Sequence, residues 1–103
     1  MYKLEYLPLA LQDILEIVNY ISSDLSNPEA AQQLAEDIVA AAEKMKAFPY
    51  SNMLFIPPKP LKHEYRKLIV KHFILFYWIE EDKKNITIAR VMYNQRNYEQ
   101  ILE

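Results

Sequence analysis

The sequence predicts a single α+β domain spanning residues 1–103, and three observations support this fold class. A short N-terminal segment alternates apolar and polar residues, two further segments carry apolar residues at intervals of three and four, and the C-terminal half is rich in β-branched and aromatic residues. A chain of 103 residues has the length of one ordinary domain. Because a helix stripe and a sheet face are unstable until they are covered, we expect the helices to pack on the sheet.

The N-terminal half is expected to hold one strand and two helices. Residues 2–7 alternate with period two, which predicts a half-buried strand. Helical spacing then predicts a first helix over residues 8–24 and a second over residues 28–48. The second begins at Asn27 and Pro28, since asparagine caps free N–H groups and proline suits the first helical position. The short connection between the helices predicts an antiparallel hairpin.

The C-terminal half is expected to complete an antiparallel sheet. Residues 49–62 hold four of the six prolines, which predicts an irregular connection. Residues 65–70, 73–80 and 86–93 are rich in β formers and predict a three-stranded antiparallel meander. A short terminal helix is expected over residues 96–102.

Two residue types are missing from the chain, and each absence excludes a class of site. Without glycine there is no glycine-rich phosphate loop, and turns that need a positive φ are expected to use Asn85 or Asn94. Without cysteine there is no disulfide, thiolate zinc site or cysteine nucleophile, and two histidines offer little to a metal. We therefore expect neither a cofactor nor a metal.

The expected cellular location and the charge distribution both limit the kinds of partner that we expect. No run reaches the roughly 20 apolar residues that cross a bilayer, and the N-terminus lacks the layout of a signal peptide, so we expect a cytoplasmic protein without a membrane partner. Residues 1–50 hold three basic and eight acidic side chains, whereas residues 51–103 hold nine basic and six acidic ones. This asymmetry predicts either a positive face for an acidic partner or phosphates, or two solvated faces.

Four segments, taken in order and at their spacings, carry a resemblance to a known family. They are Asn27-Pro28-Glu29-Ala30-Ala31, Tyr65-Arg66-x-Leu68, Leu75-Phe76-Tyr77 and Ile88-x-Arg90-Val91-Met92-Tyr93-x-x-Arg96. With them the chain resembles the RelE/ParE toxin superfamily of type II toxin–antitoxin systems over nearly its whole length.

The resemblance implies a growth-inhibiting toxin that a cognate antitoxin neutralises by wrapping a helix and an extended segment around it. By the same resemblance, the protein would contact operator DNA only as part of the toxin–antitoxin complex. RelE-like members of the superfamily are metal-independent endoribonucleases that cut messenger RNA on the ribosome. ParE-like members poison DNA gyrase and are not known to use a catalytic residue.

Ribonuclease chemistry would require groups that clamp the phosphate, transfer protons and stack on bases. Arginines on a rigid sheet suit a phosphate because the guanidinium binds it through two parallel contacts. The candidates are Arg66, Lys71, Arg90 and Arg96 for phosphate or target binding, Tyr93, Tyr98 and His72 for proton transfer, and Tyr65 and Tyr77 for base stacking. Alternatively, Arg66 and Arg90 pair with Glu64 or Glu80 on a solvated face, and the tyrosines are sheet-packing aromatics.

Two departures from the RNA-cleaving pattern favour the ParE-like branch. RNA-cleaving members usually carry an arginine at the place that Ile74 occupies here, and isoleucine cannot hold a phosphate. The net charge of −2 also contrasts with their basic character. The leading hypothesis is therefore a toxin that binds an essential target, gyrase by family precedent. The alternatives are a ribosome-dependent messenger-RNA endonuclease and a non-toxic member that binds only antitoxin.

Overall fold

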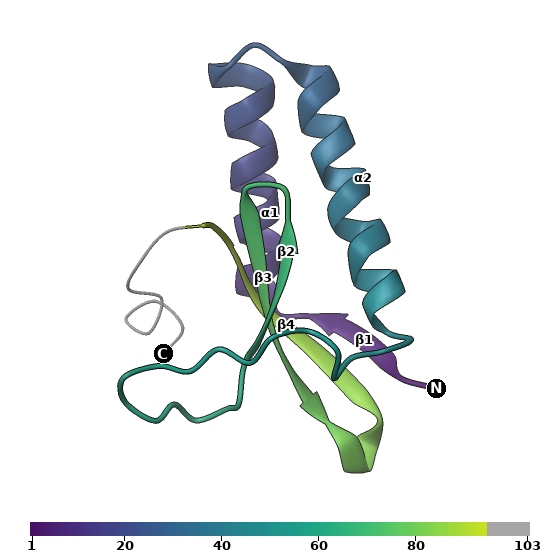
Figure 1. Cartoon of the computed structure of the whole chain (residues 1–103). Helices are drawn as coiled ribbons and strands as arrows, with labels where there is room; N and C mark the ends of the chain where they lie inside the picture. Colours follow the sequence, from purple (N-terminus) through teal and green to yellow (C-terminus); the bar gives the residue numbers. More distant parts are fainter. Residues whose placement is uncertain (95–103) are drawn as a thin grey trace.

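The computed structural model describes residues 1–94, and it confirms the α+β class. Figure 1 shows a helical hairpin standing on a sheet. The elements, in chain order, are β1 (Lys3–Tyr6), α1 (Pro8–Asn19), a π-helical turn (Tyr20–Asp24), α2 (Pro28–Met45), β2 (Arg66–Val70), β3 (Phe73–Glu80), a 3-10 turn (Glu81–Lys83) and β4 (Asn85–Tyr93). The expected terminal helix, Arg96 and Tyr98 lie outside the described residues.

The sheet has the strand order β1-β4-β3-β2 and is mixed. The predicted meander is confirmed, since β2 pairs with β3 and β3 with β4 in antiparallel fashion. The expectation of a wholly antiparallel sheet is wrong, because β1 lies parallel to β4, with Lys3 opposite Asn85 and Tyr6 opposite Ile88. The apolar–polar alternation of β1 shows which face of the strand is buried. It does not show whether the neighbouring strand runs parallel or antiparallel to it.

The helices follow the predicted signals closely. Asn27 caps α2, its Oδ1 accepting from the Ala30 N–H at 3.2 Å. The helix ends at Met45, three residues before the expected end, and the Phe48 N–H bonds to the Met45 carbonyl at 3.1 Å in the turn that follows. None of the helices in residues 1–94 is long and apolar enough to span a membrane.

The sheet is covered on both faces. Leu75 and Tyr77 face the helices and join a core that includes Ile38 of α2, while Ile74 and Phe76 point to the opposite face. On that face the irregular connection contributes a cover, with residues such as Phe55 and Leu61 packed against the sheet. Since each fully buried large apolar side chain contributes about 1.5–3 kcal/mol, the cover stabilises a face that would otherwise be exposed to water.

The turns use residues that the sequence did not indicate. Positive φ angles occur at Ser26, Lys71 and Lys84, at 51°, 55° and 50°, so the expectation for Asn85 and Asn94 is wrong. The left-handed conformation costs a non-glycine residue about 1–2 kcal/mol. Lys71 begins the two-residue turn between β2 and β3, and Lys84 leads directly into β4. At Lys71 and Lys84, strand pairing therefore decides which residue is left-handed, and the intrinsic tolerance of asparagine does not.

Candidate functional site

Arg90 is bound by an acidic residue of α1. Its Nε donates to Asp13 Oδ2 at 2.8 Å and its Nη2 donates to Oδ1 at 2.9 Å. The exposed fractions of the two side chains are 21% for Arg90 and 13% for Asp13. The hydrogen bonds to Asp13 raise the pKa of Arg90. The planar fork that the sequence offers to a phosphate is thus directed at a carboxylate of the same chain.

A β-bulge lies beside Arg90, and Asp13 also bonds to the backbone of β4 just past it. The β3–β4 register shifts between Phe76 and Tyr77, so that β4 carries an additional residue at this point. The Val91 backbone N–H is donated to Asp13 Oδ2 at 2.9 Å. Asp13 therefore binds the Arg90 cation and a backbone N–H of β4 together, and it joins α1 to the centre of the sheet.

Arg66, the first residue of β2, is held by the segment that follows α2. Its Nη1 donates to the carbonyl oxygens of Tyr50 at 3.1 Å and Asn52 at 2.8 Å. The guanidinium carbon lies 5.1 Å from the centroid of the Tyr50 ring, within the range of a cation–π contact. The observed partners of Arg66 are thus carbonyls and a ring, where the sequence suggested Glu64 or Glu80.

The residues suggested for base stacking lie in the core. Tyr65 and Tyr77 have exposed fractions of 3% and 0%. The Tyr77 hydroxyl donates to the Pro49 carbonyl at 2.6 Å and accepts from Asn52 Nδ2 at 3.2 Å. Ile74, at the place of the missing arginine, is 2% exposed and packs on the face opposite the helices. These positions favour the sheet-packing alternative for both tyrosines.

Two other predicted residues, Lys71 and Tyr93, lie at the end of the sheet where the β2–β3 turn is. Lys71 Nζ lies 2.7 Å from Asp37 Oδ2 of α2, in an exposed ion pair. Tyr93 is 58% exposed, and its ring centroid lies 6.5 Å from that of His72 and 5.7 Å from that of Phe73. The predicted site residues in the described part of the chain are thus distributed along the sheet rather than gathered in one centre.

A groove beside Tyr93 offers a different kind of site. It has a volume of about 640 Å³, and we name it the end groove; its lining residues are Glu16, Ile17, Tyr20, Ile21, Leu25, His72, Phe73 and Tyr93. Tyr20 and Leu25 are more than half exposed, at 54% and 55%. The π-helical turn Tyr20–Asp24 forms part of one wall, and such turns are frequent at functional sites. The end groove therefore exposes apolar and aromatic surface.

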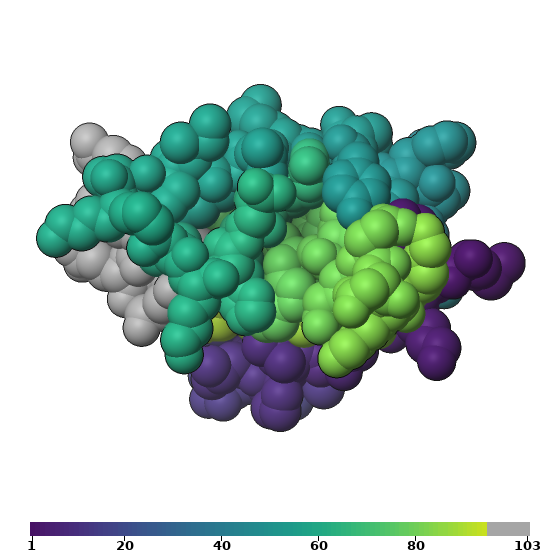
Figure 2. All heavy atoms as spheres, turned by 90° about the horizontal axis from the view of Figure 1, so that it is seen from below, coloured from purple at the N-terminus to yellow at the C-terminus, as the bar shows by residue number. Residues whose placement is uncertain are grey.

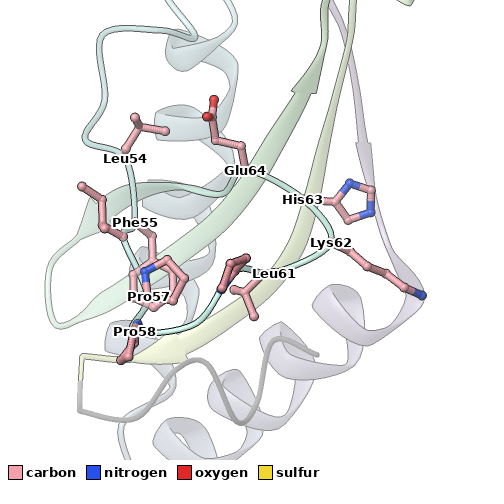
Figure 3. Close-up of a pocket in the computed structure, with 10 residues that line it drawn as sticks. Leu54, Phe55, Pro57, Pro58, Leu61, Lys62, His63 and Glu64 are labelled. Carbon is pink, nitrogen blue, oxygen red and sulfur yellow. The ribbon is translucent and has the colours of Figure 1, made fainter.

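The irregular connection forms a second hollow, shown in Figure 3. Its volume is about 530 Å³ and its walls are residues 54–58 and 60–64 of the connection itself. Lys62 extends away from the rest of the loop (Figure 3). The His63 ring stacks on Trp78 of β3, with centroids 3.6 Å apart and planes within 1°. The stacked histidine anchors the connection to the sheet.

A cluster around Glu81 was not indicated by the sequence. Glu81 Oε1 accepts from the hydroxyls of Tyr2 at 2.6 Å and Tyr50 at 2.7 Å, and its other oxygen accepts from Lys84. The bonds from Lys84 and the two tyrosines lower the pKa of Glu81 to about 2, and the bond to Glu81 raises the pKa of Tyr50 to about 12. The cluster joins the N-terminus, the irregular connection and the β3–β4 turn, and the last two lie side by side in Figure 2.

Comparison with solved structures finds the same fold in chains of toxin–antitoxin systems. A chain of the chromosomal ParDE toxin–antitoxin system from P. aeruginosa matches with a TM-score of 0.72 and 21% identity, over 92% of this chain and 98% of that one. A chain of the RelBE2 toxin–antitoxin complex from Mycobacterium tuberculosis has a TM-score of 0.58 and 18% identity, over 90% and 98% of the two chains. The isolated RelE toxin of E. coli has a TM-score of 0.55 and 18% identity, over 99% and 96%.

These likenesses define the class as the RelE/ParE toxin fold. Comparison with curated protein sequences finds no match. The family model described as "ParE toxin of type II toxin-antitoxin system, parDE" matches residues 4–98. The chain therefore belongs to the ParE toxin family, in the ParE-like branch that Ile74 and the low basicity favour.

Proposed function

We propose that this protein is the toxin of a type II toxin–antitoxin pair, that it stops growth by binding an essential protein target, and that a cognate antitoxin neutralises it. DNA gyrase is the target by family precedent. Family membership supports the toxin role. The choice of binding over RNA cleavage depends on one observation: Asp13 engages two of the three guanidinium nitrogens of Arg90, Nε and Nη2, within the fold.

The exposed surfaces agree with a binding function. Recognition of a protein is dominated by large, partly apolar side chains in a concave site, and Tyr20, Leu25 and Tyr93 supply such side chains in the end groove. A phosphate clamp by Arg66 and Arg90 stays a prediction. Release of either arginine for a phosphate would break its present hydrogen bonds, at a cost of about 1.5–3 kcal/mol for each bond to a charged group.

The direct test is a supercoiling assay with purified gyrase and the purified chain. We expect ATP-dependent supercoiling to fall as the toxin is added, and we expect addition of the antitoxin to restore it. A supercoiling rate that stays unchanged at saturating toxin would reject gyrase as the target.

Messenger-RNA cleavage is a second candidate, favoured by the pairing of two exposed proton-transfer candidates. His72 and Tyr93 lie side by side at the end of the sheet, with ring centroids 6.5 Å apart. If the chain is a nuclease, primer extension after induction will show new message ends, and these ends will disappear in Tyr93→Phe because the proton-transferring hydroxyl is lost. Growth arrest without new message ends would exclude this candidate.

A further inference from the structure

The end groove contains a carboxylate that has no cationic partner in the described part of the chain. Glu16 lines the groove and is exposed, and its Oε1 accepts from Gln12 Nε2 at 3.1 Å. Within residues 1–94 it takes part in no salt bridge. Of the described residues that line the groove, none is a lysine or an arginine, and His72 alone can gain a positive charge. The Glu16 carboxylate is therefore open to a cation that a partner brings.

Two cations close to Glu16 are already neutralised by other carboxylates. The hydrogen bonds to Asp13 raise the pKa of Arg90 and the charge of Glu16 raises it further, so Glu16 lies within electrostatic reach of this guanidinium. Arg90 itself donates to Asp13 at 2.8 and 2.9 Å. Lys71 of the β2–β3 turn lies 2.7 Å from Asp37. Since each of these cations has its own carboxylate, neither of them balances the charge of Glu16.

The backbone adds negative potential at the same place. α1 and the π-helical turn follow each other directly from Pro8 to Asp24, and their C-terminal end lies at the groove, where Tyr20, Ile21 and Leu25 are lining residues. No basic side chain occupies the last turn of α1 or the π-helical turn. The C-terminal end of a helix carries partial negative charge, which favours a cation and disfavours an anion. The helix end and Glu16 therefore select the same sign of charge.

The rest of the end groove suits an apolar group. Three half-buried lining residues pack against the main core, and they are Ile17, Ile21 and Phe73. Tyr20, Leu25 and Tyr93 are more than half exposed and offer apolar surface to a partner. The two tyrosine rings also suit a cation, since the face of an aromatic ring attracts one within about 6 Å of its centroid. The groove therefore favours a positive charge that is carried next to an apolar group.

We infer that the target presents an arginine or a lysine beside a large apolar side chain, and that the end groove binds the two together. The cation lies next to Glu16 and the helix end, and the apolar side chain lies between Tyr20, Leu25 and Tyr93. The target as the source of this pair of side chains rests on the proposed function. The chemistry of the pair rests on the Glu16 carboxylate, the helix end and the apolar walls.

The first test reverses the charge of Glu16 and compares the effect with that of a matched glutamate on α2. Glu36 is also exposed and also accepts from a glutamine four residues earlier, Gln32 Nε2 at 3.1 Å, but it lies outside the groove. We expect Glu16→Lys to raise the amount of folded toxin needed for growth arrest by about tenfold, and Glu36→Lys to stay within about twofold of the wild type. Glu16→Gln, which removes the charge without reversing it, should have a smaller effect in the same direction. Circular dichroism of each purified variant checks that it folds.

The second test uses small probes and does not depend on the identity of the target. The peptide acetyl-Leu-Arg-Leu-amide should shift the NMR signals of the Tyr20 and Tyr93 rings in the full chain. The peptide acetyl-Leu-Glu-Leu-amide should bind more weakly by about tenfold or more, because Glu16 and the helix end repel it. Glu16→Lys should weaken binding of the arginine peptide by about tenfold, and Glu36→Lys should leave it within about twofold.

The two tests separate this inference from the proposed function. If the arginine peptide binds through Glu16 but the wild type does not stop growth, the proposed function fails and the cation chemistry of the groove stands. If the wild type and Glu16→Lys stop growth equally and both peptides bind alike, the inference is rejected and the proposed function stands. If Glu16→Lys still stops growth but no longer binds the antitoxin, the groove holds the antitoxin and the inference is overturned. Self-association of the wild type that Glu16→Lys abolishes would also overturn it.

Discussion

The middle of the sheet and its far end use their polar and aromatic residues in opposite ways. By the middle we mean the level of Phe76 and Tyr77, midway along β3, where Arg66 of the edge strand β2 is bonded to carbonyls and Arg90 of β4 to Asp13. At the far end, Tyr93 and Tyr20 are 58% and 54% exposed around a groove of about 640 Å³. The comparison teaches that a charged residue in a suggestive sequence position is a weak indicator of function until its partners are known.

The physical reason for the difference is the cost of burial. A partly buried guanidinium must be paired, since an unpaired buried charge is strongly destabilising, and the fold supplies Asp13 for this purpose. Exposed aromatic side chains lower the stability of the unbound fold only a little, and they contribute apolar area when a partner binds. We therefore assign the middle of the sheet to stability and the end groove to recognition, and the following changes test that division.

The largest expected effect is on target binding through the end groove. Tyr20→Glu/Tyr93→Glu introduces two charges into the apolar groove, and since each anchor residue at an interface is worth about 2 kcal/mol or more, growth inhibition should fall by about a hundredfold or more. The free energy of unfolding should change by less than about 0.5 kcal/mol per site, because both side chains are exposed. Titrated induction of the toxin in growing cells measures the first quantity and urea unfolding the second.

The matched control is Leu9→Glu/Ile56→Glu, which charges two exposed apolar residues outside the groove. This variant should stop growth as the wild type does. Equal toxicity of the two double variants would remove the end groove from the target-binding surface.

The next largest effect is on stability in the middle of the sheet. Asp13→Ala leaves Arg90 without its carboxylate and the Val91 N–H without its acceptor, which should lower the free energy of unfolding by about 2–3 kcal/mol. Asp24→Ala, at an exposed position of the π-helical turn, should change it by less than about 0.5 kcal/mol. Urea unfolding followed by circular dichroism measures both, and an Asp13→Ala protein as stable as the wild type would refute the structural role of this pair.

The smallest effect is the acid dependence contributed by Glu81. Its pKa in the folded chain is about 2, below the ordinary value of 4.5, because Lys84, Tyr2 and Tyr50 bond to the ionised form. The stabilisation is therefore fully present above about pH 4.5 and is lost as the pH falls toward 2. Glu81→Gln should make the melting temperature less dependent on pH in this window. Melting curves between these pH values measure the slope, and an identical slope in the variant would contradict the assignment.

Local signals in the sequence predicted the elements well and their connections less well. The Asn27 cap, the two helical segments and the meander follow from patterns within a few residues of chain, and the structure confirms them. The parallel pairing of β1 depends on where distant strands meet, and the left-handed lysines depend on the exact register of neighbouring strands, which no local pattern encodes.

The candidate site could be predicted only in part. Asp13 had a detectable signal, because it lies three residues after the buried Ala10 and four before Ile17, on the helix face turned to the sheet. The bond from the Val91 N–H to this carboxylate had no such signal. The end groove combines the end of α1 with the β2–β3 turn, and residues so far apart in sequence share no spacing that could have indicated it.

We assigned the middle of the sheet to stability and the end groove to recognition. Growth inhibition by the Arg90→Gln variant tests this assignment most directly. Glutamine retains a donor for Asp13 but loses the charge and the two-armed contact that a phosphate requires. At equal amounts of folded protein, checked by circular dichroism, we predict that the variant stops growth as effectively as the wild type. A folded Arg90→Gln protein that no longer stops growth would show that Arg90 acts on the target, and it would contradict the assignment of the middle of the sheet to stability.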